Sequence, residues 1–346
     1  MQFKITSALS VLLLVPSTFG FSNTAGVSQV SCSSQSLVTP NKSLHILQST
    51  NDVDNEAKVL TKEEITESLY FPLTFDDMVK QTSSTMQAAY EKGMTRQTIR
   101  ILLPRSTDSE NLGQFYETDA ENEMGDSVLV PPDETWQGGI MQLYRACSYS
   151  CQEILRQFTR NAAGGVVPRL QEDRSVDESG VDGIGLWLTQ GSTPADDVSC
   201  FVQPAQETVS AIESISQQAG SRLVTLMNPQ WRITDDALDT ASRSEGAWGT
   251  FASFLGGKGG SLRKLEELGF TNVFVMEGYV CRGGNTRMMK RFDSDWAVFA
   301  ENDAGTEFIK VGTSETRPTY QDIDAMLEEK GVALKYARDI GLAPKL

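Results

Sequence analysis

Two periods of hydrophobicity run along this chain, one typical of helices and one typical of strands. Apolar residues recur every three or four positions in residues 75–93 and 136–158, which predicts amphipathic helices there. Short apolar runs bounded by turn residues predict strands. The expected helices are 62–69, 75–93, 136–158, 208–219, 262–268 and 319–330, and the expected strands are 98–103, 183–189, 198–202, 222–227, 272–281, 287–292, 296–300 and 307–311.

The order of these elements predicts the fold class. Strands and helices alternate in the first two thirds of the chain, which indicates a parallel sheet with helices on its faces. The last third has four short strands with turns between them, which is typical of an antiparallel meander. We therefore predict an α/β fold with one mixed sheet, consisting of a parallel βα core and a C-terminal antiparallel meander. Residues 72–346 are expected to form a single α/β domain, preceded by a linker at 51–71.

Three segments have the polar composition of loops. Residues 105–135 are acidic and contain one short apolar piece, Val128–Val130. Residues 161–183 are rich in glycine and charge, and they predict an exposed loop. Residues 232–260 predict a long loop that ends in five residues of glycine and lysine.

The N-terminus has the pattern of a targeting sequence. One lysine precedes the apolar run Ala8–Val15, and small residues up to Gly20 fit a signal-peptidase site, so residues 1–20 predict a signal peptide. Residues 21–50 contain no Asp or Glu and many Ser and Thr, which predicts a plastid transit peptide-like segment. Together they resemble the bipartite presequence of algae with secondary plastids, such as diatoms, and imply the plastid stroma. The alternative is a plain secretory signal followed by a disordered linker.

Composition excludes several classes of chemistry. The chain has 346 residues and a formal net charge of −16, which argues against non-specific binding to nucleic acid. The sequence contains one histidine, His45, inside the predicted targeting region. If processing removes it, no Ser-His-Asp triad, histidine base or histidine metal site can form. No later segment of 18 apolar residues is present, so we expect no transmembrane segment in the mature chain.

Polar side chains at strand ends are the best candidates for a ligand site. Asn228 and Gln230 follow the buried-type strand 222–227, and Arg105 follows an earlier strand. In open α/β sheets, ligands bind beyond the carboxyl ends of strands, so these residues predict a small-molecule pocket. The structural alternative, which the residue types favour, is that Asn228 caps a turn fixed by Pro229.

The glycine-rich sequence Gly256–Gly260 adds a candidate for phosphate binding. Its glycines would let backbone N–H groups approach an anion near Lys258, in front of a helix N-terminus. The Walker A pattern fails, because Lys258 is followed by Gly259 and not by Ser or Thr. A flexible surface loop is therefore the favoured interpretation.

The cysteines and the charged clusters give weaker signals. Cys147 and Cys151 are four residues apart on an apolar helix face, which favours buried structural thiols over a metal or redox pair. Nothing in the sequence assigns a redox role to these two or to Cys200 and Cys281. The acidic pairs favour helix capping over metal binding or acid–base chemistry, namely Asp76–Asp77, Asp196–Asp197 and Asp235–Asp236. Three arginines of the C-terminal strands either form a local basic patch or, as favoured, offset nearby acids, namely Arg282, Arg287 and Arg291.

Several segments together resemble a known family. They are FDDMVKQTSSTMQAAYEKG (75–93), IRILLP (99–104), GGIMQLYRACSYSCQEILRQ (138–157), DGIGLWLTQG (182–191), DDVSCFVQP (196–204), GSRLVTLMNPQWR (220–232), FLGGKGG (254–260), YVCRGG (279–284), FDSDWAVFAE (292–301) and RPTYQDIDAML (317–327). This set is similar to the plastid and cyanobacterial family called domain of unknown function 1995, in its algal form. The resemblance implies a plastid protein, and one plant branch of the family is an assembly factor of the low photosystem II accumulation type. It implies no catalytic residues.

Two hypotheses of function follow. The first is a non-catalytic auxiliary factor in photosystem or thylakoid protein biogenesis, which contacts plastid proteins such as photosystem assembly factors. The second is a small-molecule or nucleotide-binding α/β protein, including an enzyme, with a site formed by Arg105, Asn228, Gln230 and Lys258. We expect no metal, no resident cofactor and no nucleic-acid partner.

Overall fold

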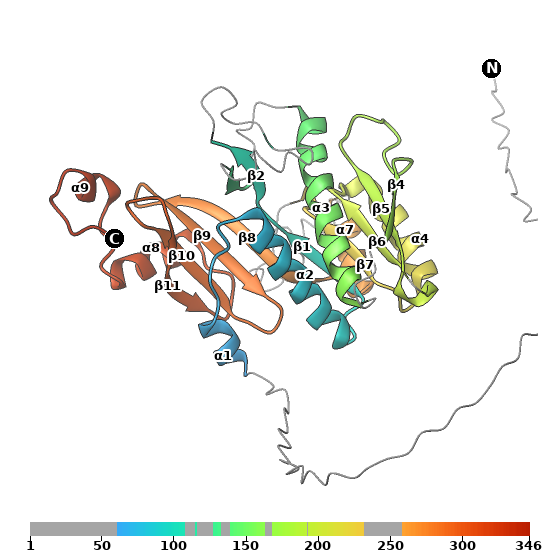
Figure 1. Ribbon diagram of the computed structural model, residues 1–346, viewed down its shortest axis with the longest axis horizontal. Coiled ribbons are helices and arrows are strands. Elements are labelled where there is room, and N and C mark those ends of the chain that lie inside the picture. Colours follow the sequence, from blue (N-terminus) through green and yellow to red (C-terminus); the bar gives the residue numbers. More distant parts are fainter. Residues whose placement is uncertain are drawn as a thin grey trace, which may run out of the picture. The chain divides into compact units, whose positions relative to one another are not determined.

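One mixed sheet of nine strands organises the chain (Figure 1). The structure is a computed structural model, and it describes residues 61–107, 115, 127–132, 139–162, 168–191, 193–231 and 258–346. These residues all belong to one compact unit, Lys58–Leu346. The strand order across the sheet is β11-β10-β9-β8-β1-β7-β6-β5-β4, and β2 pairs with β3 in a separate hairpin. The strands are β1 (Arg96–Arg100), β2 (Leu103–Ser106), β3 (Ser127–Val130), β4 (Arg169–Asp173), β5 (Gly185–Gln190), β6 (Val198–Val202), β7 (Val224–Met227), β8 (Thr271–Cys281), β9 (Gly284–Arg291), β10 (Trp296–Glu301) and β11 (Phe308–Ser314).

Four parallel strands form the centre of the sheet. β1 lies between β7 and β8 and is parallel to both, and β6 is parallel to β7. These strands carry apolar side chains on both faces, as expected for a sheet covered by helices on both sides. In β7, for example, Val224 and Leu226 pack into one hydrophobic cluster, while Met227 packs into the cluster on the opposite face.

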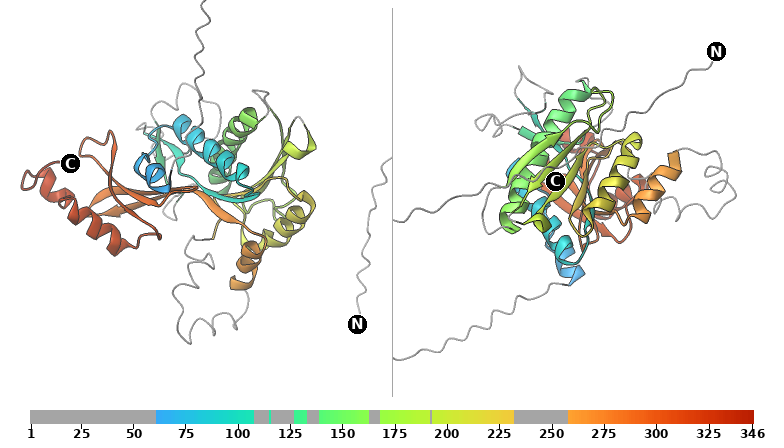
Figure 2. Two further views of the ribbon diagram at one scale, coloured as in Figure 1. Left: turned by 90° about the horizontal axis from the view of Figure 1, so that it is seen from below. Right: turned by 90° about the vertical axis from the view of Figure 1, so that its right-hand side faces the viewer.

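Helices cover both faces of this sheet (Figure 2, left). α2 and α3 pack on one face, over residues such as Ile99, Phe274 and Phe299. On the opposite face, α4 and α7 cover one end of the sheet and α8 covers the antiparallel strands. The helices are α1 (Lys62–Glu67), α2 (Phe75–Glu91), α3 (Ile140–Ala162), α4 (Val209–Ala219), α7 (Lys258–Glu267), α8 (Tyr320–Glu329) and α9 (Lys335–Asp339), with 3₁₀ turns at Pro194–Asp196 and Gln206–Thr208.

Local sequence explains where the helices begin and end. The Thr74 hydroxyl accepts a hydrogen bond from the backbone N–H of Asp77 at 3.2 Å, which satisfies an amide of the first turn of α2. Gly93 follows this helix with φ of +84°, a conformation that favours glycine. The carboxylate of Asp322 and the hydroxyl of Thr319 form a reciprocal capping box at the start of α8. Of the acidic pairs, Asp196 shows the expected capping, because its carboxylate accepts a hydrogen bond from the N–H of Thr193 at 3.1 Å, whereas Asp76 and Asp77 lie in the first turn of α2, whose cap is Thr74.

Strands β8 to β11 pair in sequence order and form the predicted antiparallel meander. α8 packs directly on this meander, and a glycine makes the close approach possible. A Cβ atom at Gly312 of β11 would lie only 2.8 Å from the sulfur of Met326 of α8. The strand backbone and the helix therefore touch at a position that has no room for a larger residue.

The predicted α/β class, with its parallel core and C-terminal meander, is confirmed. The prediction of an exposed loop at 161–183 is wrong for Arg169–Asp173, which forms an antiparallel edge strand with β5, and for Asp177, which is buried, whereas residues 178–182 are exposed as predicted. Residues 163–167 lie outside the described residues. The predicted loop over 232–260 is wrong at its end, where α7 already begins at Lys258. Residues 232–257 lie outside the described residues.

Candidate functional site

Asn228 ends β7 and joins it to the chain that follows β1. Its side-chain oxygen Oδ1 accepts a hydrogen bond from the N–H of Ile101 at 2.8 Å, and its Nδ2 donates to the carbonyl of Ile101 at 3.1 Å. The residue is buried and has a φ of +45°, which asparagine tolerates better than most residues. The amide therefore satisfies two buried backbone groups, in agreement with the structural interpretation of this residue.

Gln230 ties three segments together at the same edge. Its Nε2 donates to the carbonyl of Gln203, just beyond β6, at 3.0 Å and to the carbonyl of Asp182 at 3.1 Å. Arg100, at the end of β1, donates from its guanidinium to the carbonyls of Pro229 at 3.2 Å and Trp231 at 2.9 Å. Polar side chains at the carboxyl edge of the parallel strands are therefore hydrogen-bonded to backbone carbonyls of the same edge.

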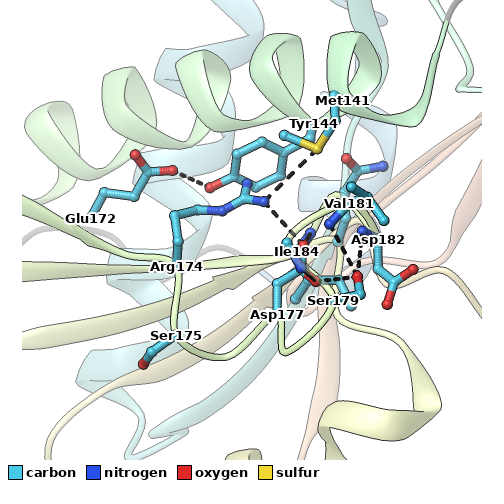
Figure 3. A network of polar contacts seen from close by, with 12 residues as sticks. Met141, Tyr144, Glu172, Arg174, Ser175, Asp177, Ser179, Val181, Asp182 and Ile184 are labelled. Atoms are coloured by element: carbon cyan, nitrogen blue, oxygen red, sulfur yellow. Dashed lines mark hydrogen bonds and ion pairs between the residues drawn. The ribbon is translucent and has the colours of Figure 1, made fainter.

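Beside this edge, Asp177 organises the turn that leads from β4 into β5 (Figure 3). Its carboxylate accepts hydrogen bonds from the Ser179 hydroxyl at 2.7 Å and the Gly180 N–H at 2.8 Å, and it pairs with Arg174 at 3.0 Å. Burial acts to raise the pKa of Asp177, but hydrogen bonds from Ser179 and from backbone amides outweigh it and lower the pKa. Asp177 is therefore an ionised, internally bonded carboxylate that fixes the turn.

Tyr144 of α3 connects this turn to the helix layer (Figure 3). Its hydroxyl donates to the carboxylate of Glu172, and the guanidinium carbon of Arg174 lies 4.0 Å from the centre of its ring. Burial, followed by the Glu172 carboxylate, raises the pKa of Tyr144. The phenol therefore stays protonated at neutral pH and acts as a donor. A Cβ atom at Gly185 would lie 2.0 Å from the Tyr144 oxygen, so only glycine fits opposite this ring.

Sequence reasoning missed the Asp177 network because its segment is polar and predicted to be exposed. A readable signal was present, since Asp-x-Ser-Gly at 177–180 is the composition of a turn in which short polar side chains bond the backbone. The network uses its charges internally, and it links α3, β4 and the turn before β5. Its geometry indicates a structural role.

The other two predicted site residues lie on different elements. Arg105 is half-buried in β2, where it is paired with Val128 of β3. Lys258 is the first residue of α7, so the predicted glycine-loop phosphate site has a helical backbone from this residue onward. Among the described residues, no hydrogen bond joins Arg105 to Asn228 or Gln230. A ligand pocket shared by all four residues stays a prediction.

Buried thiols lie behind the Asn228 edge. Cys147 and Cys151 of α3 are buried as expected, and Cys200 of β6 is buried in the same hydrophobic cluster. Burial, followed by the neighbouring Cys200, raises the pKa of both α3 thiols, so they are protonated at neutral pH and poor nucleophiles. Within the described ranges, no group of three His, Cys, Asp or Glu side chains is arranged to bind a metal.

The fold and this edge define a mixed α/β protein whose strand-end polar side chains are hydrogen-bonded to backbone groups. Residues 72–325 match the family model described as Domain of unknown function (DUF1995), which spans most of the chain. The chain therefore belongs to the DUF1995 family. No curated protein and no solved structure matches the chain.

Proposed function

We propose that this DUF1995 protein is a non-catalytic auxiliary factor of the plastid stroma that binds partner proteins during photosystem or thylakoid protein biogenesis. The predicted targeting sequence in residues 1–50 supports a location in the plastid stroma. The internally bonded polar edge supports a scaffold in preference to an open strand-end site. The observation that carries the proposal is an exposed apolar surface at the C-terminal end of the fold.

This C-terminal surface consists of five large side chains that are between 50% and 78% exposed, namely Tyr320, Leu334, Tyr336, Ile340 and Leu342. Twelve large apolar side chains are exposed in the described part of the chain, so five of them fall in this short segment. Single exposed apolar residues need no explanation, but a concentration of them marks interaction surfaces. Four of the five lie beyond residue 325, outside the range matched by the family model.

The segment that carries the C-terminal surface is anchored to the sheet. The Lys335 N–H donates to the carbonyl of Arg282, in the turn between β8 and β9, at 2.8 Å. The buried guanidinium of Arg338 pairs with Asp303, which also accepts from the N–H of Leu346 at 2.7 Å. A backbone fixed in this way presents its apolar side chains at little entropic cost, which favours binding of a folded partner.

Immunoprecipitation from plastid extract tests this function. The untagged chain is captured with an antibody from stroma and solubilised thylakoids, and the bound proteins are identified by mass spectrometry. We expect photosystem subunits or assembly proteins, and we expect the combined substitutions Leu334→Ser, Tyr336→Ser and Leu342→Ser to release them. The matched control is Leu73→Ser, because Leu73 is exposed elsewhere on the fold. Equal capture by both variants, or no such partner with the unchanged chain, refutes the proposal.

The compartment has its own test. Residues 1–50 fused to a fluorescent reporter, expressed in an alga with a secondary plastid, are expected to bring the reporter into the plastid. A reporter fused to residues 1–20 alone is expected to be secreted. Secretion of both fusions contradicts the stromal location and supports a plain secretory signal.

A further inference from the structure

Two arginines, Arg287 of β9 and Arg105 of β2, have a buried guanidinium nitrogen and no ion pair with an acid in the part of the chain that the structure describes. Arg287 of β9 is 8% exposed, and its Nε is fully buried with no hydrogen-bond partner. Its Nη1 donates to the carbonyl of its neighbour Thr286 at 3.2 Å, and its guanidinium carbon lies 5.2 Å from the centre of the Phe308 ring. Arg105 of β2 is half-buried, and its Nε is also buried without a partner. A guanidinium taken out of water without a counter-charge is costly, so this arrangement calls for an explanation.

The β2–β3 hairpin brings the two arginines together. Gly278 of β8 is the register partner of Arg287, and a Cβ atom there would lie 3.0 Å from Pro131, just after β3, and 3.1 Å from Nη1 of Arg287. The end of the hairpin therefore packs against Gly278, beside the guanidinium of Arg287. Burial lowers the pKa of Arg287, Glu301 opposes this effect, and the charge of Arg105 lowers the pKa further. The hairpin that carries Arg105 thus lies beside Arg287, and the two positive charges act against each other.

Several other arginines of this protein pair with carboxylates, and others donate to backbone carbonyls or hydroxyl groups. Examples are the pairs Arg174–Asp177, Arg282–Asp324, Arg317–Glu277 and Arg338–Asp303. The chain has 46 acidic and 30 basic residues, so carboxylates are abundant. Yet no carboxylate within the described residues forms an ion pair with Arg105 or Arg287. The nearby Glu301 instead accepts a hydrogen bond from Asn285 at 2.7 Å. The charge of Glu301 thus acts on Arg287 without an ion pair, whereas Arg282 pairs with Asp324, as expected for an arginine that offsets a nearby acid.

We propose that Arg105 and Arg287 together bind a doubly charged oxyanion, the phosphate group of a small organic phosphate. Two guanidiniums match the charge of a phosphate dianion, and their planar forks suit its oxygen atoms. The exposed side chain of Val128, paired with Arg105, and that of Val280, two residues beyond Gly278, flank the pair with apolar surface for the body of the ligand. This site lies apart from the C-terminal surface and is independent of the proposed partner binding.

The proposed site predicts effects of opposite sign on the melting temperature without phosphate and on phosphate binding. Without an anion, Arg105→Gln removes repulsion between like charges, so the variant is expected to melt at a higher temperature than the unchanged chain. With phosphate, the unchanged chain is expected to gain stability, and Arg105→Gln and Arg287→Gln are expected to bind phosphate about tenfold or more weakly, because each removes charge-assisted hydrogen bonds.

The test measures inorganic phosphate binding to the full chain by calorimetry, and melting temperature with and without phosphate at constant ionic strength. The matched control is Arg291→Gln, because Arg291 lies on the same strand, has its pKa lowered mainly by burial and bonds the Thr85 hydroxyl. We expect this control to bind phosphate as the unchanged chain does. If Arg287→Gln does not fold, Arg105→Gln in the hairpin still decides the question. Three results overturn the proposal: no phosphate binding, equal binding by all variants, or a lower melting temperature of Arg105→Gln without phosphate. The last of these indicates that acidic residues of the chain occupy the site.

Discussion

Replacing Asn228 by alanine tests whether this residue serves the fold or a ligand. The substitution leaves the N–H and the carbonyl of Ile101 buried without their partners, which were 2.8 Å and 3.1 Å away. Each such loss costs about 1–3 kcal/mol. Alanine at a φ of +45° adds about 1 kcal/mol of backbone strain. We expect Asn228→Ala to lower the free energy of unfolding by about 3–5 kcal/mol, a large part of the stability of a typical domain.

Urea unfolding followed by tryptophan fluorescence measures this loss, and Trp231 lies close enough to report on the same edge. Asn228→Gly separates the two causes, because it relieves the strain and still removes both hydrogen bonds. We expect it to be about 1 kcal/mol less damaging than alanine. Gln217→Ala on the exposed face of α4 is the control and should change stability by less than about 0.5 kcal/mol. A loss below about 1 kcal/mol for Asn228→Ala refutes the structural role of the amide.

Three further predictions follow from the contacts of Tyr144, Asp177 and Arg338. Gly185→Ala places a methyl group against the Tyr144 hydroxyl and is expected to lower the urea midpoint, with a loss of about 1–3 kcal/mol or more. The folded-state pKa of Asp177 is depressed, so its contribution to stability is present above the ordinary carboxyl pKa and is lost as pH falls through the folded value. Asp177→Asn should therefore be destabilising at neutral pH, and its stability should fall less steeply than that of the unchanged chain on acidification. Arg338→Met leaves Asp303 without its cation and should speed hydrogen exchange in the last residues of the chain.

Each of these predictions has a matched control. Gly93→Ala meets no atom within 4 Å and tests backbone strain alone, so a loss as large as that of Gly185→Ala would contradict the steric argument. Asp182→Asn lies in the same turn as Asp177 but is exposed, and its acid unfolding should match that of the unchanged chain. Lys335→Met removes an exposed ion pair with Asp339, and hydrogen exchange equal to that of Arg338→Met would refute the anchoring role of Arg338.

Hydrophobic periodicity predicted the helices and strands whose side chains pack mostly against other apolar side chains. The helical pattern of 75–93 corresponds to α2, and the apolar run of 222–227 corresponds to β7, because burial of side chains dictates both patterns. The start of β1 was missed for the opposite reason. Arg96 is charged, yet its guanidinium is taken up by backbone carbonyls. It donates to the carbonyls of Thr95, Ser216, Gly220 and Arg222. A charged residue that bonds backbone carbonyls leaves no trace in a hydrophobic pattern.

The ligand pocket at the strand ends stays a prediction. The carboxyl edge of the parallel strands does bring Asn228 and Gln230 together, as the general rule for α/β sheets predicts. The sequence could not show that these amides already bond Ile101, Gln203 and Asp182, because each of those contacts joins segments that are far apart in the chain. Whether a polar group serves the fold or a ligand depends on its partners, and the partners are set by the topology.

The partners of buried polar groups also distinguish two places where a ligand could bind, the Asn228 edge and the pair Arg105 and Arg287. At the Asn228 edge, the topology supplies backbone partners for the amide of Asn228 and for Nε2 of Gln230, so a ligand would have to compete with existing hydrogen bonds. At Arg287, the charge of Arg105 acts against that of the guanidinium, and no carboxylate of the described residues forms an ion pair with either arginine. A fold with abundant acidic residues gains nothing in stability from that pairing, because repulsion and burial both disfavour it. Ligand binding by this α/β fold is therefore expected at the arginine pair under the β2–β3 hairpin, and not at the strand ends where the general rule places it.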